Sequence, residues 1–363
     1  MIVKNEERFL APCLASIRDF VDQIVVVDTG STDRSKDIAL QFGAFVKERP
    51  WNGDFSAARN EALSLARGDW ILYIDADETM RPGNFAQVRS ELALSGMAGY
   101  YVRLHPRPGF TPYRILRIFR NQPDIRFSGV IHENMWPSIL RRYSESDVGT
   151  LDLALDHAGY EGDQSPKHAR NLPLLRKALR ENPAAVFPWC HLAEIYTALG
   201  RPRFAERAWR QALAIVRAKS KPGQDDYLPY AGLIPVISER GDEAGSLVRE
   251  AIGRFPCNAH AWWLMGRVLI QSGKFEAAID AFERVLSLGK NGTHDSDVAC
   301  DRRIFDVLTY DSLATCHFRL CDYARARHFY ELAASCDPAL QEYRVKSALC
   351  ARLERSQGKS AKG

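Results

Sequence analysis

The sequence predicts two domains, an α/β domain followed by an all-helical repeat domain. Three observations carry this prediction: a length of 363 residues, short apolar runs alternating with helical patterns in the first half, and helical periodicity alone from about His157. A chain of this length exceeds one average domain, and each half is long enough to bury its own core. We expect the α/β domain at residues 1–156, the repeat domain at 157–350 and a polar tail at 351–363.

Short apolar runs mark the expected strands of the first half. They are MIV, QIVVVDTG, AFVKERP and DWILYIDADE, followed by the arginine-rich runs GYYVRLHP and RILRIFRN. Between the first runs lie segments with helical spacing, such as Glu6 to Phe20, whose apolar residues form one stripe. This alternation predicts a parallel sheet with helices on its faces. Near-continuous runs such as IVVV are typical of strands buried on both faces.

Polar residues follow three of these strands at their carboxyl ends. They are Lys4, Asn5 and Glu6 after the first strand, the segment from Asp28 to Asp33 after the second, and Asp75, Asp77 and Glu78 after the fourth. Ligands of open α/β sheets bind outside the carboxyl ends of the strands. The sequence therefore predicts one crevice lined by these polar residues.

A repeated helix pair is visible in the second half. The segments WCHLAEIYTALGRPRFAERAWRQA, WWLMGRVLIQSGKFEAAIDAFERV and YDSLATCHFRLCDYARARHFYELA begin at Trp189, Trp262 and Tyr310, and a weaker copy surrounds Gly232. Each has an aromatic residue, then a small residue, an alanine and a second aromatic residue. This spacing resembles the tetratricopeptide repeat, two antiparallel helices in about 34 residues. We expect these aromatic residues to pack in the core rather than bind a cofactor.

Composition and charge exclude several classes of protein. With 46% hydrophobic and 26% charged residues, the chain is neither disordered nor collagen-like. Its eight cysteines lie far apart without a C-x-x-C pair, which fits neither a zinc ribbon nor a disulfide framework. The net charge of +4 hides a group of arginines between Arg103 and Arg142. Such a group is typical of a solvated face, although it also suits an anionic ligand. We expect no nucleic-acid partner.

No membrane segment is expected. No apolar run approaches the roughly 18 residues needed to span a bilayer. The start, MIVKNEERFL, has charges where a signal peptide needs its apolar region. These features predict a cytoplasmic protein.

The motifs MIVKNEE, IVVVDTGSTD, FSAARNEAL and GDWILYIDADE, in this order, resemble the inverting glycosyltransferases of family two. The resemblance covers about Met1 to Tyr160 and implies the GT-A fold, with a mixed, mostly parallel sheet. It also implies a nucleotide-sugar donor and a divalent metal. The first strand of this fold usually begins before the segment matching MIVKNEE, so the strand is expected to be either short or truncated here.

The resemblance assigns donor-site roles by position. Asp28 and Asp33 become base-side residues, Arg59 a phosphate-side residue, and Asp75 and Asp77 the D-x-D motif. Lys4, Asn5 and Glu6 are further donor-site candidates because they follow the first strand. We expect Asp75 at the donor's sugar side and Asp77 on the metal. For Asp33 an alternative stays open, because STDRS also predicts a helix N-cap there.

The chemistry of the D-x-D motif agrees with a metal site. A leaving diphosphate gains negative charge, so Mg²⁺ or Mn²⁺ on its oxygens lowers the barrier. Mg²⁺ usually takes only one or two carboxylates plus phosphate and water. The resemblance implies a late histidine as a further metal ligand, and His157 has that place in chain order. Packing at the domain boundary is the alternative for His157.

An inverting transfer also needs a base that deprotonates the acceptor. The segment RFSGVIHENMW presents His132 and Glu133. The resemblance implies Glu133 as the base with His132 beside it, although the more usual pair in this family is acidic. A surface turn with a solvated glutamate is the alternative.

Three other functions share features of this sequence. YIDADET matches the D-x-D-x-T motif of haloacid dehalogenase phosphatases, whose first aspartate is the nucleophile, but that motif follows the first strand of its domain and this one follows the fourth. A dinucleotide-binding domain needs glycines after its first strand, and KNEERFL has none. A non-catalytic protein whose repeats bind a peptide is the rival from another class.

The sequence therefore predicts an inverting glycosyltransferase joined to a helical repeat array. We expect a UDP-sugar as donor and a peptide, a lipid-linked sugar or a glycan as acceptor. The repeats present a surface suited to the acceptor, to another protein or to self-association. The combination is similar to bacterial family-two enzymes with tetratricopeptide tails, including some that glycosylate peptides.

Overall fold

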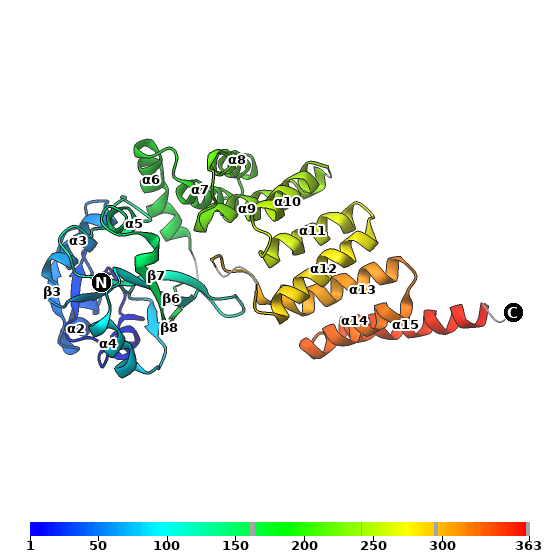
Figure 1. The fold of residues 1–363 in the computed structure, drawn as a ribbon, viewed down its shortest axis with the longest axis horizontal. Coiled ribbons are helices and arrows are strands. Elements are labelled where there is room, and N and C mark those ends of the chain that lie inside the picture. Colours follow the sequence, from blue (N-terminus) through cyan, green and yellow to red (C-terminus); the bar gives the residue numbers. More distant parts are fainter. Residues whose placement is uncertain (160–163, 241, 294–296, 361–363) are drawn as a thin grey trace. The chain divides into compact units, whose positions relative to one another are not determined.

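The computed structural model describes residues 1–159, 164–240, 242–293 and 297–360, and the chain forms two compact units, Met1–Leu192 and Ala193–Gly363 (Figure 1). The mixed α/β domain followed by a helical repeat domain is confirmed. The division between the units falls within α7 (Val186–Ala198). The predicted division before residue 157 stays a prediction about where the repeat domain begins.

The first sheet has three parallel strands in the order β1-β2-β3. The strands are β1 (Ile2–Val3), β2 (Val25–Asp28) and β3 (Phe45–Glu48). In the register, Val3 pairs with Asp28 and Asp28 with Glu48, so all three strands end at the same edge. The connecting helices are α1 (Leu10–Ile17), α2 (Ser35–Gln41) and α3 (Phe55–Leu65). This sheet has the parallel pairing that the strand–helix alternation predicts.

The second sheet is mostly antiparallel, with the order β4-β7-β6-β8-β5 and one parallel pair, β6 with β8. Its strands are β4 (Trp70–Leu72), β5 (Glu78–Met80), β6 (Gly99–His105), β7 (Tyr113–Arg120) and β8 (Val148–His157). The two arginine-rich runs are β6 and β7, as predicted. The short helices α4 (Phe85–Leu94) and α5 (Trp136–Ile139) lie in the connections.

β8 was not predicted, although its sequence holds a clear signal. Leu151, Leu153 and Leu155 are buried and alternate with more exposed neighbours along the strand. This period of two is the pattern of a strand with one buried face. The pairing of β8 with β5 brings His157 opposite Glu78, so the overlooked strand delivers a candidate site residue.

The D-x-D motif lies in the connection between β4 and β5 rather than at the end of one long strand. β4 ends at Leu72, and β5 begins at Glu78. The Asp75 carbonyl accepts a hydrogen bond from the Glu78 N–H at 3.1 Å, which closes the turn. Asp75 and Asp77 therefore belong to the turn between β4 and β5, where both are partly buried.

The predicted helix pairs are present in the second half. After α6 (Ser165–Glu181) and α7 come α8 (Pro202–Ala218), α9 (Leu228–Val236), α10 (Asp242–Arg254), α11 (Ala259–Gln271), α12 (Phe275–Lys290), α13 (Val307–Arg319), α14 (Tyr323–Cys336) and α15 (Gln341–Ser360). Figure 1 shows α11 to α15 as successive antiparallel neighbours. The predicted tail is helical as far as Ser360, and residues 361–363 lie outside the described part of the chain.

Glycine lets the repeat helices approach the large aromatic side chains. A Cβ on Gly266 would lie 2.5 Å from Cζ of the fully buried Phe282, and one on Gly232 would overlap the Trp209 ring. Trp209, Phe282 and Tyr330 are buried. The prediction that the aromatic residues pack in the core is confirmed for these three, the second aromatic residue of each repeat, whereas the first ones, Trp189, Trp262 and Tyr310, are only partly buried.

A cavity of about 680 Å³ lies in the first unit between the amino ends of β2 and β4. Its lining is partly apolar and partly polar and comes from the segments around Ile17–Val25, Ala62–Ile74 and Leu92, together with Met1 and Arg59. Asp28, Asp75 and Asp77 do not line it. The cavity therefore does not coincide with the predicted crevice.

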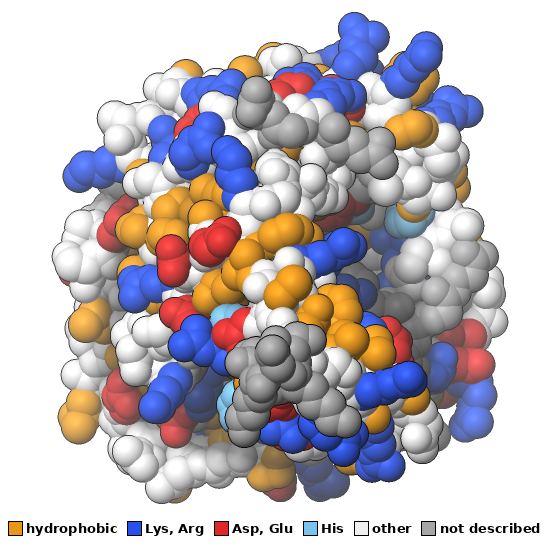
Figure 2. All heavy atoms as spheres, turned by 90° about the vertical axis from the view of Figure 1, so that its right-hand side faces the viewer, with side chains coloured by type: hydrophobic (Ala, Val, Ile, Leu, Met, Phe, Trp, Pro, Cys, Tyr) orange, Lys and Arg blue, Asp and Glu red, His pale blue; other side chains and the backbone are white. Residues whose placement is uncertain are grey.

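No helix among the described residues combines the length and the apolar character needed to cross a membrane. On the face drawn in Figure 2, the coloured Lys and Arg side chains lie among acidic and apolar ones rather than in one continuous stripe.

Candidate donor site

The ends of β1 and β2 are joined by side-chain hydrogen bonds. The Asn5 N–H donates to Ser31 Oγ at 2.9 Å, and the Thr32 N–H donates to Asn5 Oδ1 at 2.8 Å. Asn5 has a φ of 57°, a left-handed conformation that asparagine tolerates better than most residues. One residue on, the Glu6 N–H donates to Ser35 Oγ at 2.8 Å. The structure thus brings together two of the three strand ends that the sequence singles out.

Asp28 presents one unpaired oxygen at the end of β2. Its Oδ1 accepts hydrogen bonds from the N–H groups of Gly30 and Ser31, both at 2.9 Å. Oδ2 is buried and has no hydrogen-bond partner among the described residues. A buried acceptor without a donor costs about 1–3 kcal/mol, so Asp28 keeps an acceptor whose partner would have to come from a ligand or a solvent molecule.

Asp33 fixes the local backbone. Its Oδ1 accepts from the Ser35 N–H at 2.9 Å and its Oδ2 from the Glu7 N–H at 3.1 Å. Asp33 directly precedes Arg34, the N-cap residue of α2, so these contacts hold the backbone at the start of that helix without making Asp33 the N-cap. A direct role for Asp33 in donor binding stays a prediction.

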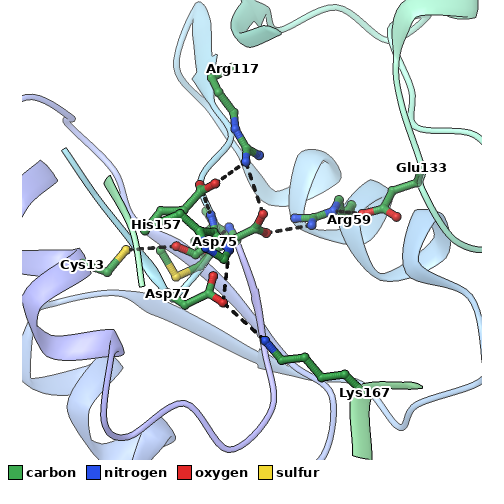
Figure 3. A network of polar contacts seen from close by, with 11 residues as sticks. Cys13, Arg59, Asp75, Asp77, Arg117, Glu133, His157 and Lys167 are labelled. Carbon is green, nitrogen blue, oxygen red and sulfur yellow. Dashed lines mark hydrogen bonds and ion pairs between the residues drawn. The ribbon is translucent and has the colours of Figure 1, made fainter. Parts of the chain in front are cut away.

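Asp75 lies between two arginines (Figure 3). Arg59 Nη2 donates to Oδ1 at 2.7 Å, and Arg117 Nη2 approaches Oδ2 at 3.4 Å. Both guanidinium groups also lie over the ring of Tyr73, at 4.4 and 4.0 Å from its centroid. Burial alone would raise the pKa of Asp75, but Arg59 and then Arg117 outweigh it and hold the pKa well below its usual value. Asp75 is therefore ionised and fixed in position.

Arg59 joins this carboxylate to Glu133, because its Nε forms an ion pair with Glu133 Oε1. The contact follows from how α3 is anchored. Ser56 Oγ donates to the Gly129 carbonyl at 2.6 Å, and the Asn60 amide exchanges hydrogen bonds with the backbone of Phe127. Arg59 stands on the same helix, so it meets the segment that carries Glu133. Two carboxylates already neutralise the arginine that was expected on the phosphate side.

The buried pair of Arg117 and Glu78 was not predicted. Arg117, on β7, has a side chain 3% exposed, and it forms an ion pair with Glu78 Oε1 of β5. Arg117 was one member of an arginine group that is typical of a solvated face. Three guanidinium nitrogens of this cluster, Arg59 Nη1 with Arg117 Nε and Nη1, are buried without a hydrogen-bond partner among the described residues. The cluster therefore holds unused donors beside Asp75.

Asp77 faces a histidine and a lysine (Figure 3). Its Oδ2 lies 3.5 Å from His157 Nε2 and 3.9 Å from Lys167 Nζ. The Asp77 carbonyl accepts from the Ala158 N–H at 2.9 Å, which ties the turn to the end of β8. The structure thus brings together the two residues that the sequence proposed as metal ligands. Lys167, on α6, was not predicted, and no motif marks it.

Gly159 leaves room for the Asp77 carboxylate. A Cβ at this position would overlap Asp77 Oδ2 and lie 2.8 Å from its Cγ. The Gly159 N–H donates to His157 Nδ1 at 3.2 Å. In the neutral ring this contact places the proton on Nε2, the nitrogen that faces Asp77. The ring therefore serves as a hydrogen-bonding neighbour of Asp77 in this state and would have to change tautomer to bind a metal through Nε2.

Asp77 and His157 fit a divalent cation whose other ligands come from phosphate oxygens and water rather than from the protein. Among the described residues, no three His, Cys, Asp or Glu side chains are grouped as a metal site. Mg²⁺ needs only one or two carboxylates when phosphate oxygens and water complete its shell. Asp77, with His157 beside it, provides that partial set.

Glu6 and Lys4, which follow β1, differ in charge and in exposure. Glu6 is partly buried, and burial, followed by the charge of Asp77, raises its pKa to about 7. This dependence shows that the end of β1 lies in the field of the D-x-D turn. Lys4 is exposed at the end of β1.

His132 and Glu133 point to different partners. His132 Nε2 lies 2.6 Å from Nδ1 of His191 on α7, and the Phe187 ring packs against it at 4.5 Å. Burial lowers the pKa of His132 to about 3, with His191 contributing. The backbone φ of His132 is 53°, and this left-handed turn directs the two successive side chains apart. His132 is thus a neutral packing partner of α7, while Glu133 lies with Arg59.

Comparison with known families agrees with this arrangement. Residues 1–146 match the family described as glycosyl transferase family 2, and residues 259–291 match the tetratricopeptide repeat. The N-terminal domain is a family 2 glycosyltransferase domain. The family 2 match contains every site residue that the sequence proposes except His157.

Several curated relatives share part of this chain. A TPR repeat-containing protein of Synechococcus elongatus is 35% identical over 222 residues, 59% of this chain and 55% of that protein. The prophage-derived glycosyltransferase SunS of Bacillus subtilis is 30% identical over 201 residues, 52% of this chain and 46% of SunS. An uncharacterized glycosyltransferase of Rickettsia bellii is 38% identical over 170 residues, 44% of this chain and 57% of that protein. The chain thus spans about half the length of these relatives.

Solved repeat proteins resemble part of the chain weakly. MamA protein matches with a TM-score of 0.37 and 16% identity, over 47% of this chain and 84% of MamA. YrrB, a TPR protein with an unusual peptide-binding site, matches with a TM-score of 0.39 and 16% identity, over 50% of this chain and 84% of YrrB. Similarity at this level carries no argument about function.

Proposed function

We propose that the protein transfers a sugar from a nucleotide-sugar donor, a UDP-sugar in our assignment, to a nucleophile on an acceptor, with inversion at the anomeric carbon. The observation that supports this most is the D-x-D turn inside a family 2 domain, where Asp75 is fixed between two arginines and Asp77 lies beside His157.

The donor's base belongs at the end of β2 in this proposal. The unpaired Oδ2 of Asp28 suits the ring N–H of a uracil, which is a single hydrogen-bond donor. Asn5 and Glu6 line the neighbouring strand end, with Lys4 at its rim. Asp33 supports the loop through its hydrogen bonds to backbone N–H groups, and a direct contact with the base stays a prediction.

The diphosphate belongs beside the D-x-D turn. Asp77 and His157 would hold the Mg²⁺ or Mn²⁺ ion, which when bound supplies positive charge to the leaving diphosphate. Asp75, kept ionised by Arg59 and Arg117, is suited to accept hydrogen bonds from the donor's sugar hydroxyls. The unused guanidinium nitrogens of Arg59 and Arg117 add donors on the same side.

The transfer needs a base on the acceptor side. The acceptor's oxygen or other nucleophile attacks the anomeric carbon, the bond from that carbon to the diphosphate oxygen breaks, and the acceptor's proton passes to the base. We assign this role to Glu133, whose carboxylate is held by Arg59. His132 is assigned a positioning role, because its ring packs against Phe187 and His191.

The acceptor is assigned to the peptide, lipid-linked or glycan class, with the helical repeats as its docking surface or as a site for another protein. The cytoplasmic location expected from the sequence stays a prediction.

The geometry disfavours a phosphatase of the haloacid dehalogenase type. Its nucleophile would be Asp75, yet both oxygens of Asp75 are engaged by arginines. A non-catalytic repeat protein differs in one observable, since it would bind no nucleotide at the D-x-D turn.

A binding screen tests the proposal. UDP, dTDP and GDP are titrated with Mn²⁺ and with EDTA, and the thermal unfolding midpoint is followed. We expect UDP with Mn²⁺ to stabilise wild type most and Asp28→Asn to reduce that preference, because the substituted amide loses the acceptor's charge. Equal stabilisation by all three nucleotides would contradict the assignment of Asp28, and no stabilisation by any of them would favour the non-catalytic alternative.

A further inference from the structure

Helix α6 brings two cations to the donor site, although it lies outside the matched family 2 segment. Lys167 Nζ donates to the Gly159 carbonyl at 2.8 Å and lies 3.9 Å from Asp77 Oδ2. One turn later, Arg170 lies over the Phe55 ring at 5.3 Å and interacts with the charges of Glu6 and Glu133. Residues three apart lie on the same face of a helix, so this face of α6 is directed toward the acidic site.

The distance between Lys167 Nζ and Asp77 Oδ2 can be compared with the distance between two oxygen atoms that bind the same cation. Oxygens bound to one Mg²⁺ at 2.0–2.1 Å lie about 3–4 Å apart. The separation of Lys167 Nζ from Asp77 Oδ2 is in this range. The ammonium therefore occupies the region next to Asp77 into which a cation and the oxygens of its phosphate ligands must fit.

The side chain of Lys167 is free to adjust. It is 46% exposed, whereas Asp77 is 16% exposed and fixed by the turn. An ammonium and a divalent cation repel each other, so a cation bound to this carboxylate oxygen would disfavour the present position of the Lys167 ammonium. A diphosphate bound beside them offers the ammonium new anionic partners within reach of its flexible stem.

We propose that Lys167 is a diphosphate-binding residue of the donor site, contributed by α6, which neutralises Asp77 in the empty site and pairs with the donor's diphosphate when a cation takes Asp77. The inference rests on the proposed function, since it takes a nucleoside diphosphate as the ligand. Arg170 extends the same positive face toward Glu6 and Glu133.

This role predicts opposite effects of one substitution on two equilibria. In Lys167→Gln, Mn²⁺ alone should bind about twofold more tightly or better, because a competing charge is removed from Asp77. The complex of Mn²⁺ and UDP should bind about tenfold more weakly or worse, because a charged hydrogen bond to phosphate is lost. Lys167→Arg should restore most of the affinity for Mn²⁺ with UDP.

The experiment is isothermal titration of the full chain with Mn²⁺ and, separately, with UDP at saturating Mn²⁺. Lys177→Gln is the matched control, because Lys177 lies on the same helix and pairs only weakly with Glu181 at 4.0 Å. The control should leave both affinities unchanged.

Three outcomes would overturn the inference. Unchanged UDP affinity in Lys167→Gln would make Lys167 a bystander, and tighter binding of both ligands would make it only a competitor of the metal. Loss of both affinities together with a lower unfolding midpoint would make it a structural residue. If wild type itself binds no UDP with Mn²⁺, the proposed function fails, which is a result distinct from these three.

Discussion

At the scale of single residues, the position of the Asp77 carboxylate depends on the glycine at position 159. A Cβ at Gly159 would overlap the Asp77 carboxylate, so Gly159→Ala should displace the carboxylate from His157. We expect Mn²⁺-dependent UDP binding to weaken by about tenfold or more, the scale of a lost charged contact. Titration of UDP with and without Mn²⁺ measures this loss.

Gly96→Ala is the control for this substitution, because a Cβ at Gly96 would meet no atom within 4 Å. It should leave nucleotide binding unchanged. Equal affinities of the Gly159 and Gly96 variants would show that the Asp77 carboxylate is not needed where the structure has it.

At the scale of elements, the contact between the His132 loop and α7 should make stability depend on pH. Burial lowers the pKa of His132 to about 3 and of His191 to about 4, whereas both titrate near 6.5 in an unfolded chain. As the pH falls from about 6.5 toward 4, the unfolded state binds protons that the folded state does not. Stability is therefore lost over this window, by at most about 1.4 kcal/mol per pH unit for each ring.

Urea unfolding at pH 7 and pH 5 measures this dependence. His191→Gln removes one titrating ring and should make the loss of stability on acidification smaller. His328→Gln, on an exposed residue of α14, should behave as wild type does. A His191 variant with the wild-type pH dependence would contradict the account of this contact.

The repeat helices offer a second prediction at this scale, because one substitution there has two opposing effects on stability. Gly266→Ala improves helix propensity by about 1 kcal/mol but drives a methyl group into Phe282, which costs about 1–3 kcal/mol. Gly253→Ala meets no atom within 4 Å and keeps only the gain in propensity. We expect the first variant to unfold at lower urea concentration than wild type and the second at equal or higher concentration. The opposite order would contradict the close packing of the repeat.

The elements that were predicted are those marked by a pattern within their own short segment of sequence. The parallel strands β1–β3 were anticipated from their short apolar runs, and the repeat helices from their strong periodic pattern. β8 alternates as regularly, yet it lies at the junction with the helical half and was overlooked. The pairing of β8 with β5, which brings His157 to Asp77, depends on contacts between distant segments.

In the candidate site, too, contacts between distant segments were not predicted. Asp28, Asp75 and Asp77 stand at strand ends and were found by motif and position. The ion pairs of Arg59 with Glu133 and of Arg117 with Glu78 join residues 74 and 39 positions apart, and no local pattern marks them. Lys167 belongs to a helix that the sequence assigned to the repeat domain, so its place beside Asp77 is visible only in the fold.

At the scale of the whole molecule, a family 2 domain precedes a helical repeat array. We propose that the D-x-D turn of the family 2 domain binds a divalent metal together with a nucleotide sugar. We assign the metal to Asp77, whose side chain is 16% exposed and lies beside His157. Asp19, whose side chain is 86% exposed and paired with Arg18, offers an aspartate outside the site as a control.

The most direct test is the rate of UDP-sugar turnover by the full chain with Mn²⁺, compared with EDTA and with Asp77→Asn. We expect turnover with Mn²⁺ to fall by about 100-fold or more in EDTA and in Asp77→Asn, the scale of losing a main electrostatic contact to the leaving group. Turnover should persist in Asp19→Asn. Turnover that is equal in wild type and Asp77→Asn, or that needs no metal, would contradict this expectation.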